Sequence, residues 1–223
     1  MGVILPSFAA KHREDVEAGR VASSGHSNRA SHGGNYHRLM STKLDADKYE
    51  LGAIRSQKQR IERKLELLGA YADYLTTVIN GDNRSHNETL VTICLWALDT
   101  GKHEYFMTLA EFALQSGMNS PKGFKRSLPE LLLEEFSKVV MNKAKPQYDI
   151  DRLMRLGELT KGANITDEVT AKFHKARGLA LQTSEPQAAL LAYQTAKAYG
   201  AKVKQYITRL EKALCKQANQ TSA

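Results

Sequence analysis

The sequence predicts an all-α fold. From Leu44 onward, apolar residues recur at intervals of three and four positions, the spacing that places them on one face of an α-helix. Glycines such as Gly101 and Gly117 follow several of these stretches, where a helix end favours the left-handed backbone. No stretch shows the sustained alternation of polar and apolar residues that a half-buried strand needs. We expect four helical or flexible segments, 1–35, 36–80, 81–146 and 147–223.

The first segment, residues 1–35, is predicted to be a flexible N-terminal arm. Serine, glycine, asparagine and histidine dominate Ser23–Asn28 and Ser31–Asn35, and apolar periodicity is weak. Such an arm either binds DNA or a partner or has no function of its own, and its composition leaves both open.

The second segment, residues 36–80, is predicted to form a long coiled-coil-like helix for DNA binding and oligomerisation. We expect one helix over residues 47–79, capped by Asp47 and ~50 Å long. Its apolar residues are separated alternately by three and four positions, and only Lys58 interrupts this seam. The seam consists of Leu51, Ile54, Lys58, Ile61, Leu65, Leu68, Ala72, Leu75 and Ile79. One small core cannot cover such a helix, so the seam needs a partner helix, from another copy or from the same chain.

The third segment, residues 81–146, is predicted to be the central helical core. Ser85 and Glu88 form a capping box, so a helix should begin there, and its apolar residues cover nearly every side. Asp99-Thr100-Gly101 should end this helix, and an amphipathic helix should follow as far as Gly117. After a basic loop at 118–126, another helix should end before Pro146.

The fourth segment, residues 147–223, is predicted to form C-terminal helical hairpins, with helices at about 149–161, 167–182, 184–200 and 201–217. Residues 173–199 resemble a single tetratricopeptide hairpin, because Gly178 precedes Ala189, Tyr193 and Ala196 at spacings of four and three. One degenerate unit predicts that two helices pack closely through small residues.

Charge favours an acidic partner such as nucleic acid. The 223 residues include 32 Lys and Arg against 24 Asp and Glu, a net charge of +8. Residues 161–223 hold ten basic and four acidic residues, whereas residues 81–160 hold ten and eleven. The C-terminal cations could hold DNA non-specifically or dock a partner protein, and the sequence leaves both open. They include Lys197, Lys202, Lys204, Arg209, Lys212 and Lys216.

Several functional classes are disfavoured. Cys94 and Cys215 are too few for a disulfide framework or a zinc site, which favours a reducing cytosol. No apolar run is long enough to span a bilayer. The chain lacks the GxxxxGK[ST] loop of an ATPase, and we expect no cofactor.

Three carboxylates raise the question of nuclease activity. Asp149, Asp151 and Glu158 fall in one predicted short helix, and clustered carboxylates can hold Mg²⁺. A solvated helix face with Arg152 and Arg155 as ion-pair partners explains them more simply. We therefore assign no catalytic or metal-binding residue. The sequence does not settle whether the chain is an enzyme, and it favours a non-catalytic role.

Two basic clusters are better candidates for contact with nucleic acid. One lies on the predicted long helix, where cations outside the seam can face a phosphate backbone. The other is the loop at 122–126, where Phe124 adds an aromatic ring that could stack or wedge. A solvated helix flank and an ordinary surface loop are the alternatives. The predicted DNA-binding residues are Arg55, Arg60, Arg63, Lys64, Lys122, Lys125 and Arg126.

The chain also resembles a known family. The blocks Leu95-Trp-Ala-Leu-Asp-Thr-Gly101, Ala110-Glu-Phe-Ala-Leu-Gln-Ser-Gly117, the Pro-Lys-Gly-x-Lys-Arg loop and Asp167-Glu-Val-Thr-Ala-Lys-Phe-His174 resemble the small terminase subunits of temperate contractile-tailed phages. The likeness covers roughly residues 36–214, and family members often carry the name terminase endonuclease subunit. It implies an oligomer, such as a ring, that recognises viral DNA and delivers it to a large ATPase–nuclease subunit.

These observations lead to one hypothesis and two alternatives. The hypothesis is a small terminase subunit of a viral DNA-packaging machine, acting in the cytoplasm of the bacterial host. Its implied partners are double-stranded viral DNA, the large terminase subunit and further copies of itself. The alternatives are a metal-dependent DNA endonuclease in its own right and a helical adaptor that binds only protein.

Overall fold

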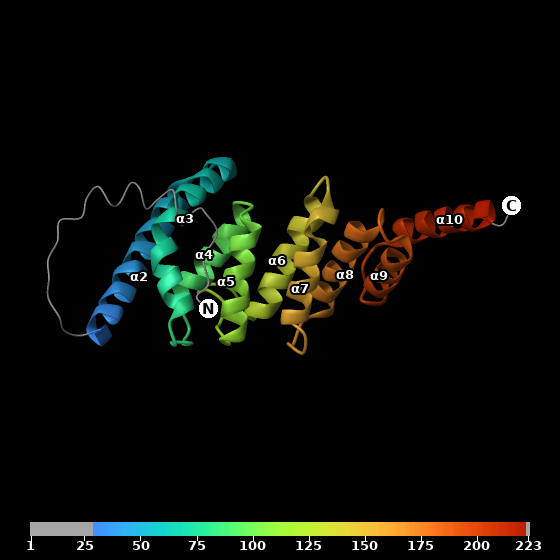
Figure 1. Cartoon of the computed structure of the whole chain (residues 1–223). Coiled ribbons are helices and arrows are strands. Elements are labelled where there is room, and N and C mark those ends of the chain that lie inside the picture. Colours follow the sequence, from blue (N-terminus) through green and yellow to red (C-terminus); the bar gives the residue numbers. More distant parts are fainter. Residues whose placement is uncertain (1–28, 222–223) are drawn as a thin grey trace. The chain divides into compact units, whose positions relative to one another are not determined.

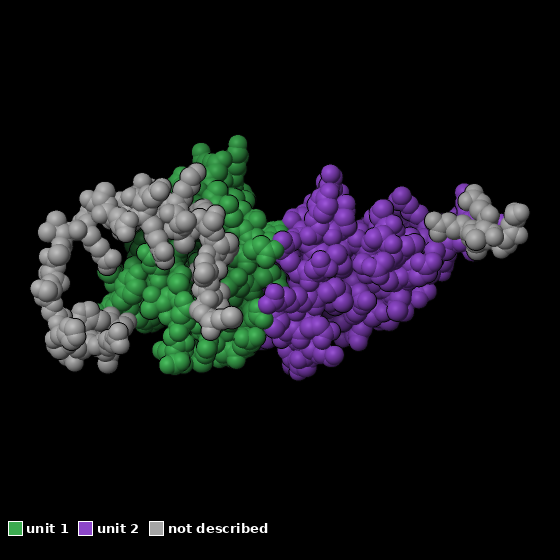
Figure 2. Space-filling view, viewed as in Figure 1, with its two compact units in different colours: residues 1–123 green, residues 124–223 purple. Residues whose placement is uncertain are grey.

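The computed structural model describes residues 29–221, which form nine α-helices and one 3₁₀ helix, with no strand among them. The predicted all-α class is therefore confirmed. The chain divides into two compact units, residues 1–123 and 124–223, called unit 1 and unit 2 below (Figure 2). Unit 1 contains α2 (Arg29–Ala53), α3 (Gln57–Asn80), α4 (Glu88–Asp99) and α5 (His103–Gln115). Unit 2 contains α6 (Leu128–Asn142), η1 (Pro146–Asp149), α7 (Ile150–Leu159), α8 (Asp167–Leu181), α9 (Pro186–Ala198) and α10 (Lys204–Thr221) (Figure 1).

The prediction of one long helix over residues 47–79 is wrong, because the chain breaks between Ala53 and Gln57. The next helix, α3, is capped by Ser56, whose side chain accepts a hydrogen bond from the Gln59 N–H. Asp47, predicted to be a cap, lies inside α2. It is buried and accepts hydrogen bonds from Tyr71 and Lys43.

The two helices fold back on each other as an antiparallel hairpin (Figure 1). Early α2 meets late α3, because His37 Nδ1 lies 2.5 Å from the Tyr74 hydroxyl. Late α2 meets early α3 through the pair of Glu50 with Arg63. The seam thus finds a partner within the same chain. Leu51, Leu68, Ala72, Leu75 and Ile79 are buried, whereas Leu65 is partly exposed and Lys58 lies in solvent.

The hairpin of α4 and α5 agrees with the prediction except at its first cap. Asn87, rather than Ser85, caps α4, because its side chain accepts from the Leu90 N–H. Asn87 also donates to the Tyr74 hydroxyl at 2.8 Å, which joins α4 to α3. Gly101 and Gly117 have φ angles of 72° and 62°, so both end their helices in the left-handed conformation as predicted.

In unit 2, helices α8 and α9 pack through small residues, as predicted. Gly178 is buried against the ring of Tyr193, and Ala189 and Ala196 are fully buried beside it. The ring of Tyr193 in turn stacks on Tyr206 of α10 at a centroid distance of 5.1 Å. The tetratricopeptide label itself stays a prediction.

The predicted four-segment division also stays a prediction. Most of the predicted flexible arm, residues 1–28, lies outside the described residues, and residues 29–35 form the beginning of α2. Within the described range, none of the helices has the length and apolar character required to cross a membrane.

Candidate nucleic-acid interface

The tip of the α2–α3 hairpin carries two of the predicted DNA-binding cations, Arg55 and Arg60, together with Lys58. The Arg60 guanidinium donates to the Ile54 carbonyl oxygen at 2.6 Å, so it supports the turn between the helices. Arg55 and Lys58 extend into solvent on this tip. Over residues 29–221, Lys58 meets only Glu62, at 3.9 Å, and its side chain is 87% exposed. The tip therefore presents two cations whose charge is available to an incoming anion.

One turn further along α3, Arg63 is committed to carboxylates of unit 1. Its Nε and Nη2 donate to the two carboxylate oxygens of Glu50 at 2.7 and 3.1 Å, and its Nη1 donates to Glu66. The hydrogen bonds that Arg63 donates to Glu50 and Glu66 raise the pKa of this guanidinium. A two-pronged contact of this kind fixes geometry as well as charge. Arg63 thus fastens α3 to α2 instead of facing outward.

Lys64 is also engaged inside unit 1. Its ammonium group donates to the Asp99 carboxylate at 2.5 Å, and only 14% of its side chain is exposed. Because Asp99 is the last residue of α4, this contact fastens α3 to the end of the most apolar helix.

The basic loop is anchored near its start by Glu88. The carboxylate oxygens of Glu88 accept from the Lys122 backbone N–H at 3.2 Å, and the Lys48 ammonium donates to one of them at 2.8 Å. Burial alone would raise the pKa of Glu88, but the hydrogen bond and charge of Lys48, with the Lys122 N–H, lower it below its usual value. The Lys122 side chain points into solvent. Glu88 therefore holds the backbone of the loop and leaves the cation exposed.

The end of the loop is fixed within unit 2 by Glu134. This carboxylate is only 7% exposed, and it pairs with Arg126, Lys138 and Lys172. Arg126 also reaches Glu168 at 3.4 Å. Between the two anchors of the loop, Lys125 and Phe124 are exposed.

The seven predicted DNA-binding residues therefore fall into two groups. Arg55, Lys122 and Lys125 are exposed, and the described part of the chain gives them no ion-pair partner. The other four hold the fold through contacts with carboxylates or a carbonyl; they are Arg60, Arg63, Lys64 and Arg126. Exposed cations on fixed backbone can bind phosphate oxygens without first breaking an internal ion pair.

Sequence reasoning missed the positioning role of Glu88 and Glu134. Glu88 was interpreted as part of a capping box, and its partners Lys48 and Lys122 lie 40 and 34 residues away along the chain. No local pattern reveals such a pairing, because it depends on how the helices pack.

The carboxylates considered for nuclease chemistry have different surroundings. Asp149 is 2% exposed and pairs with Lys143 and, at 3.1 Å, with Arg152. Asp151 and Glu158 are exposed on α7. Over residues 29–221, the structure brings no three His, Cys, Asp or Glu side chains into a group that could hold a metal ion.

Comparison with known proteins identifies relatives of the chain. Residues 41–168 match a family model described as phage small terminase subunit. Over 180 residues, the chain is 34% identical to the "Terminase, endonuclease subunit" of Escherichia phage P2, and this alignment covers 78% of the chain and 73% of the relative. No solved structure matches the chain.

Proposed function

Since the chain belongs to the phage small terminase subunit family, we propose that it binds the packaging-start site of phage DNA as an oligomer. In this role it delivers the DNA to a large terminase subunit, which supplies ATP hydrolysis and cutting, in the cytoplasm of the bacterial host. The observation that carries the proposal is the set of exposed cations Arg55, Lys58, Lys122 and Lys125 on anchored backbone.

The strength of such binding comes from repetition. Each cation that neutralises a phosphate releases a counterion, and the affinity then depends steeply on salt. A few such contacts give each copy only a modest affinity for DNA. Several copies on one DNA segment bind together, because the first contact raises the effective concentration of the DNA at the next.

The first test measures the salt dependence of DNA binding. We expect Arg55→Gln/Lys58→Gln and Lys122→Gln/Lys125→Gln each to flatten the slope of log K against log salt by up to about 1.8, at about 0.9 for each phosphate contact. Fluorescence anisotropy with duplex phage DNA over a salt series gives this slope directly.

The matched control removes two cations that the fold already uses. Arg63→Gln/Lys64→Gln deletes the same charge, but both side chains are paired with carboxylates, so we expect a smaller change in slope and a lower unfolding temperature. Wild-type protein that fails to bind duplex DNA at low salt would refute the proposed function. Equal slope changes for all three variants would show that DNA binding depends on the net charge of the chain and not on the positions of the exposed cations.

Assembly of copies needs a surface other than the predicted seam, since most of that seam is buried within unit 1, where α3 packs on both α2 and α4. The outer face of α2 supplies one. Leu39 and Tyr49 are 61% and 86% exposed, and Ala46 between them is exposed as well. These residues fall on one helical stripe at spacings of seven and three. Exposed apolar stripes of this kind support association between subunits.

The second test measures mass. We expect the wild-type chain to sediment as an oligomer and Leu39→Lys/Tyr49→Lys to shift it toward the monomer, because two buried charges would oppose the contact. Sedimentation velocity across a concentration series distinguishes these states. Leu191→Lys, which also replaces a large exposed apolar residue but lies on α9, serves as the control. A wild-type chain that remains monomeric at all working concentrations would contradict the oligomeric part of the proposal.

A further inference from the structure

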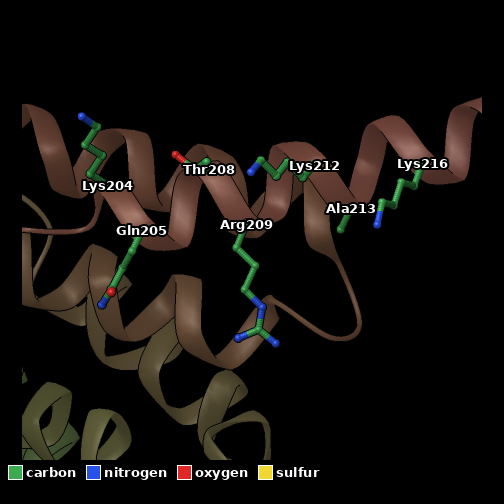
Figure 3. A pocket seen from close by; sticks show the side chains of 7 residues that line it. All are labelled: Lys204, Gln205, Thr208, Arg209, Lys212, Ala213 and Lys216. Carbon is green, nitrogen blue, oxygen red and sulfur yellow. The ribbon is translucent and has the colours of Figure 1, made fainter.

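The last helix, α10, has two faces of opposite character. Its apolar face includes Leu210, which is buried, and Ile207, which packs against the core formed by α8 and α9. Its other face lines an open groove and is wholly exposed. The residues of this C-terminal basic face are Lys204, Gln205, Thr208, Arg209, Lys212, Ala213 and Lys216 (Figure 3).

The charges of this face are not used by the fold. Among the side chains that the structure describes, none forms an ion pair with Lys204, Arg209, Lys212 or Lys216, in contrast to the paired cations around Glu134. Glu211 lies beyond one edge of the face, on the flank next to Ile207. Four positive charges therefore stand together without internal neutralisation.

The spacing of the cations forms a row along the helix. Lys204, Lys212 and Lys216 are separated by multiples of four residues, so they wind along α10 by about 40° for each step of four. Lys204 and Lys212 extend to one side of the helix, whereas Arg209 and Lys216 extend to the other (Figure 3). At about 1.5 Å per residue, the row is ~18 Å long. Duplex DNA carries one negative charge per about 1.7 Å of axis, or roughly ten charges over that length. The row thus meets a dense, repeating array of anions.

The composition of the face decides between the two partners that the sequence left open. The centre of a protein interface is depleted in lysine and holds aromatic or other large apolar residues. Here the face has three lysines and no large apolar side chain. Base-reading side chains are limited to Gln205 and Arg209, whereas flexible lysines contact phosphates regardless of sequence. A polyanion of uniform backbone fits this face better than an acidic protein does.

We propose that the C-terminal basic face binds the phosphate backbone of duplex DNA without regard to sequence. This inference rests on the proposed function, because it assumes that the chain acts on DNA. It adds a further DNA contact, on α10 of unit 2. The hairpin tip and loop can then serve recognition of a particular site, while α10 holds whatever duplex lies next to it.

The test uses the full-length chain and a 30-base-pair duplex of random sequence. The variant Lys204→Gln/Arg209→Gln/Lys212→Gln/Lys216→Gln should bind this duplex at least about tenfold more weakly at 0.1 M salt, with a slope of log K against log salt reduced by up to about 3.6. Glutamine keeps a similar helix propensity, so far-UV circular dichroism should be unchanged. The double variant Lys212→Gln/Lys216→Gln should show about half the slope change, and it serves if the quadruple variant folds poorly.

A control of equal charge separates this surface from net charge. The variant Lys102→Gln/Lys145→Gln/Arg155→Gln/Lys161→Gln removes four exposed cations elsewhere and should change the slope much less. If the wild-type chain binds no duplex at all, the proposed function fails. If the wild-type chain binds but the α10 variant keeps its affinity and slope, only the present inference is overturned. The inference would also be overturned if the α10 variant lost its binding to poly-glutamate but kept its affinity for the duplex. That result would favour an acidic protein partner for this face.

Discussion

Replacing Gly178 by valine should destabilise unit 2 by about 3 kcal/mol, because no room exists for a branched side chain there. A Cβ atom at this position would lie 2.6 Å from Cε1 and 2.7 Å from Cδ1 of Tyr193. That ring is fully buried and stacks on Tyr206, so it cannot swing aside as the tip of a long side chain could. The helices α8 and α9 would have to separate.

The size of the effect should follow the size of the added group. Gly178→Ala adds one methyl group, and its clash is partly offset by the better helix propensity of alanine, so we expect a loss of about 1 kcal/mol. Gly52→Ala is the matched control, since a Cβ there meets no atom within 4 Å and α2 should gain up to about 1 kcal/mol. The two glycine-to-alanine changes therefore have opposite signs.

Urea unfolding followed by far-UV circular dichroism gives these free energies. Trp96, the one tryptophan of the chain, lies in unit 1, so its fluorescence reports on that unit separately. Combining Gly178→Ala with Tyr193→Leu should cost less than the sum of the two single changes, because leucine removes the clashing ring. Strict additivity of the two changes would contradict the proposed contact.

Local signals predicted the C-terminal ends of α4 and α5, because the physics of such an end is contained in a few neighbouring residues. Gly101 and Gly117 stop their helices with positive φ angles, as their positions after apolar stretches indicate. The buried faces of α4 and α5 follow from the same periodicity. The close approach of α8 and α9 was predictable from Gly178 and the alanines opposite, because side chains this small allow two helices to pack closely.

Features of the structure that depend on residues far apart in the chain could not be predicted from local sequence patterns. The seam of residues 51–79 fits a continuous coiled coil as well as a hairpin, and a three-residue turn at 54–56 decides between them. A local pattern does not distinguish Arg63 from Arg55 either. One pairs with Glu50 and the other faces solvent only because α3 folds back on α2. The candidate site was therefore predicted as a region, and the roles of its cations required the structure.

Replacing Asp149 by alanine should destabilise unit 2 by about 2–3 kcal/mol. The carboxylate is buried between Lys143, at the end of α6, and Arg152 on α7, so it joins two helices across η1. Removing one partner of a buried ion pair is costly because the remaining charges lose their counterion. Both cations are about one-third exposed and can turn toward water, which keeps the cost below that of a fully buried pair.

The neighbouring carboxylates provide the control and separate a structural role from a catalytic one. Asp151→Ala and Glu158→Ala remove exposed groups and should change the free energy of unfolding by no more than about 0.5 kcal/mol, measured by the same urea titration. If the three carboxylates formed a nuclease centre, all three changes would abolish Mg²⁺-dependent cutting of DNA while Asp149→Ala left stability intact. An ion pair that joins α6 to α7 requires the opposite pattern, in which stability falls for Asp149→Ala alone and any effect on DNA follows the fraction of folded protein.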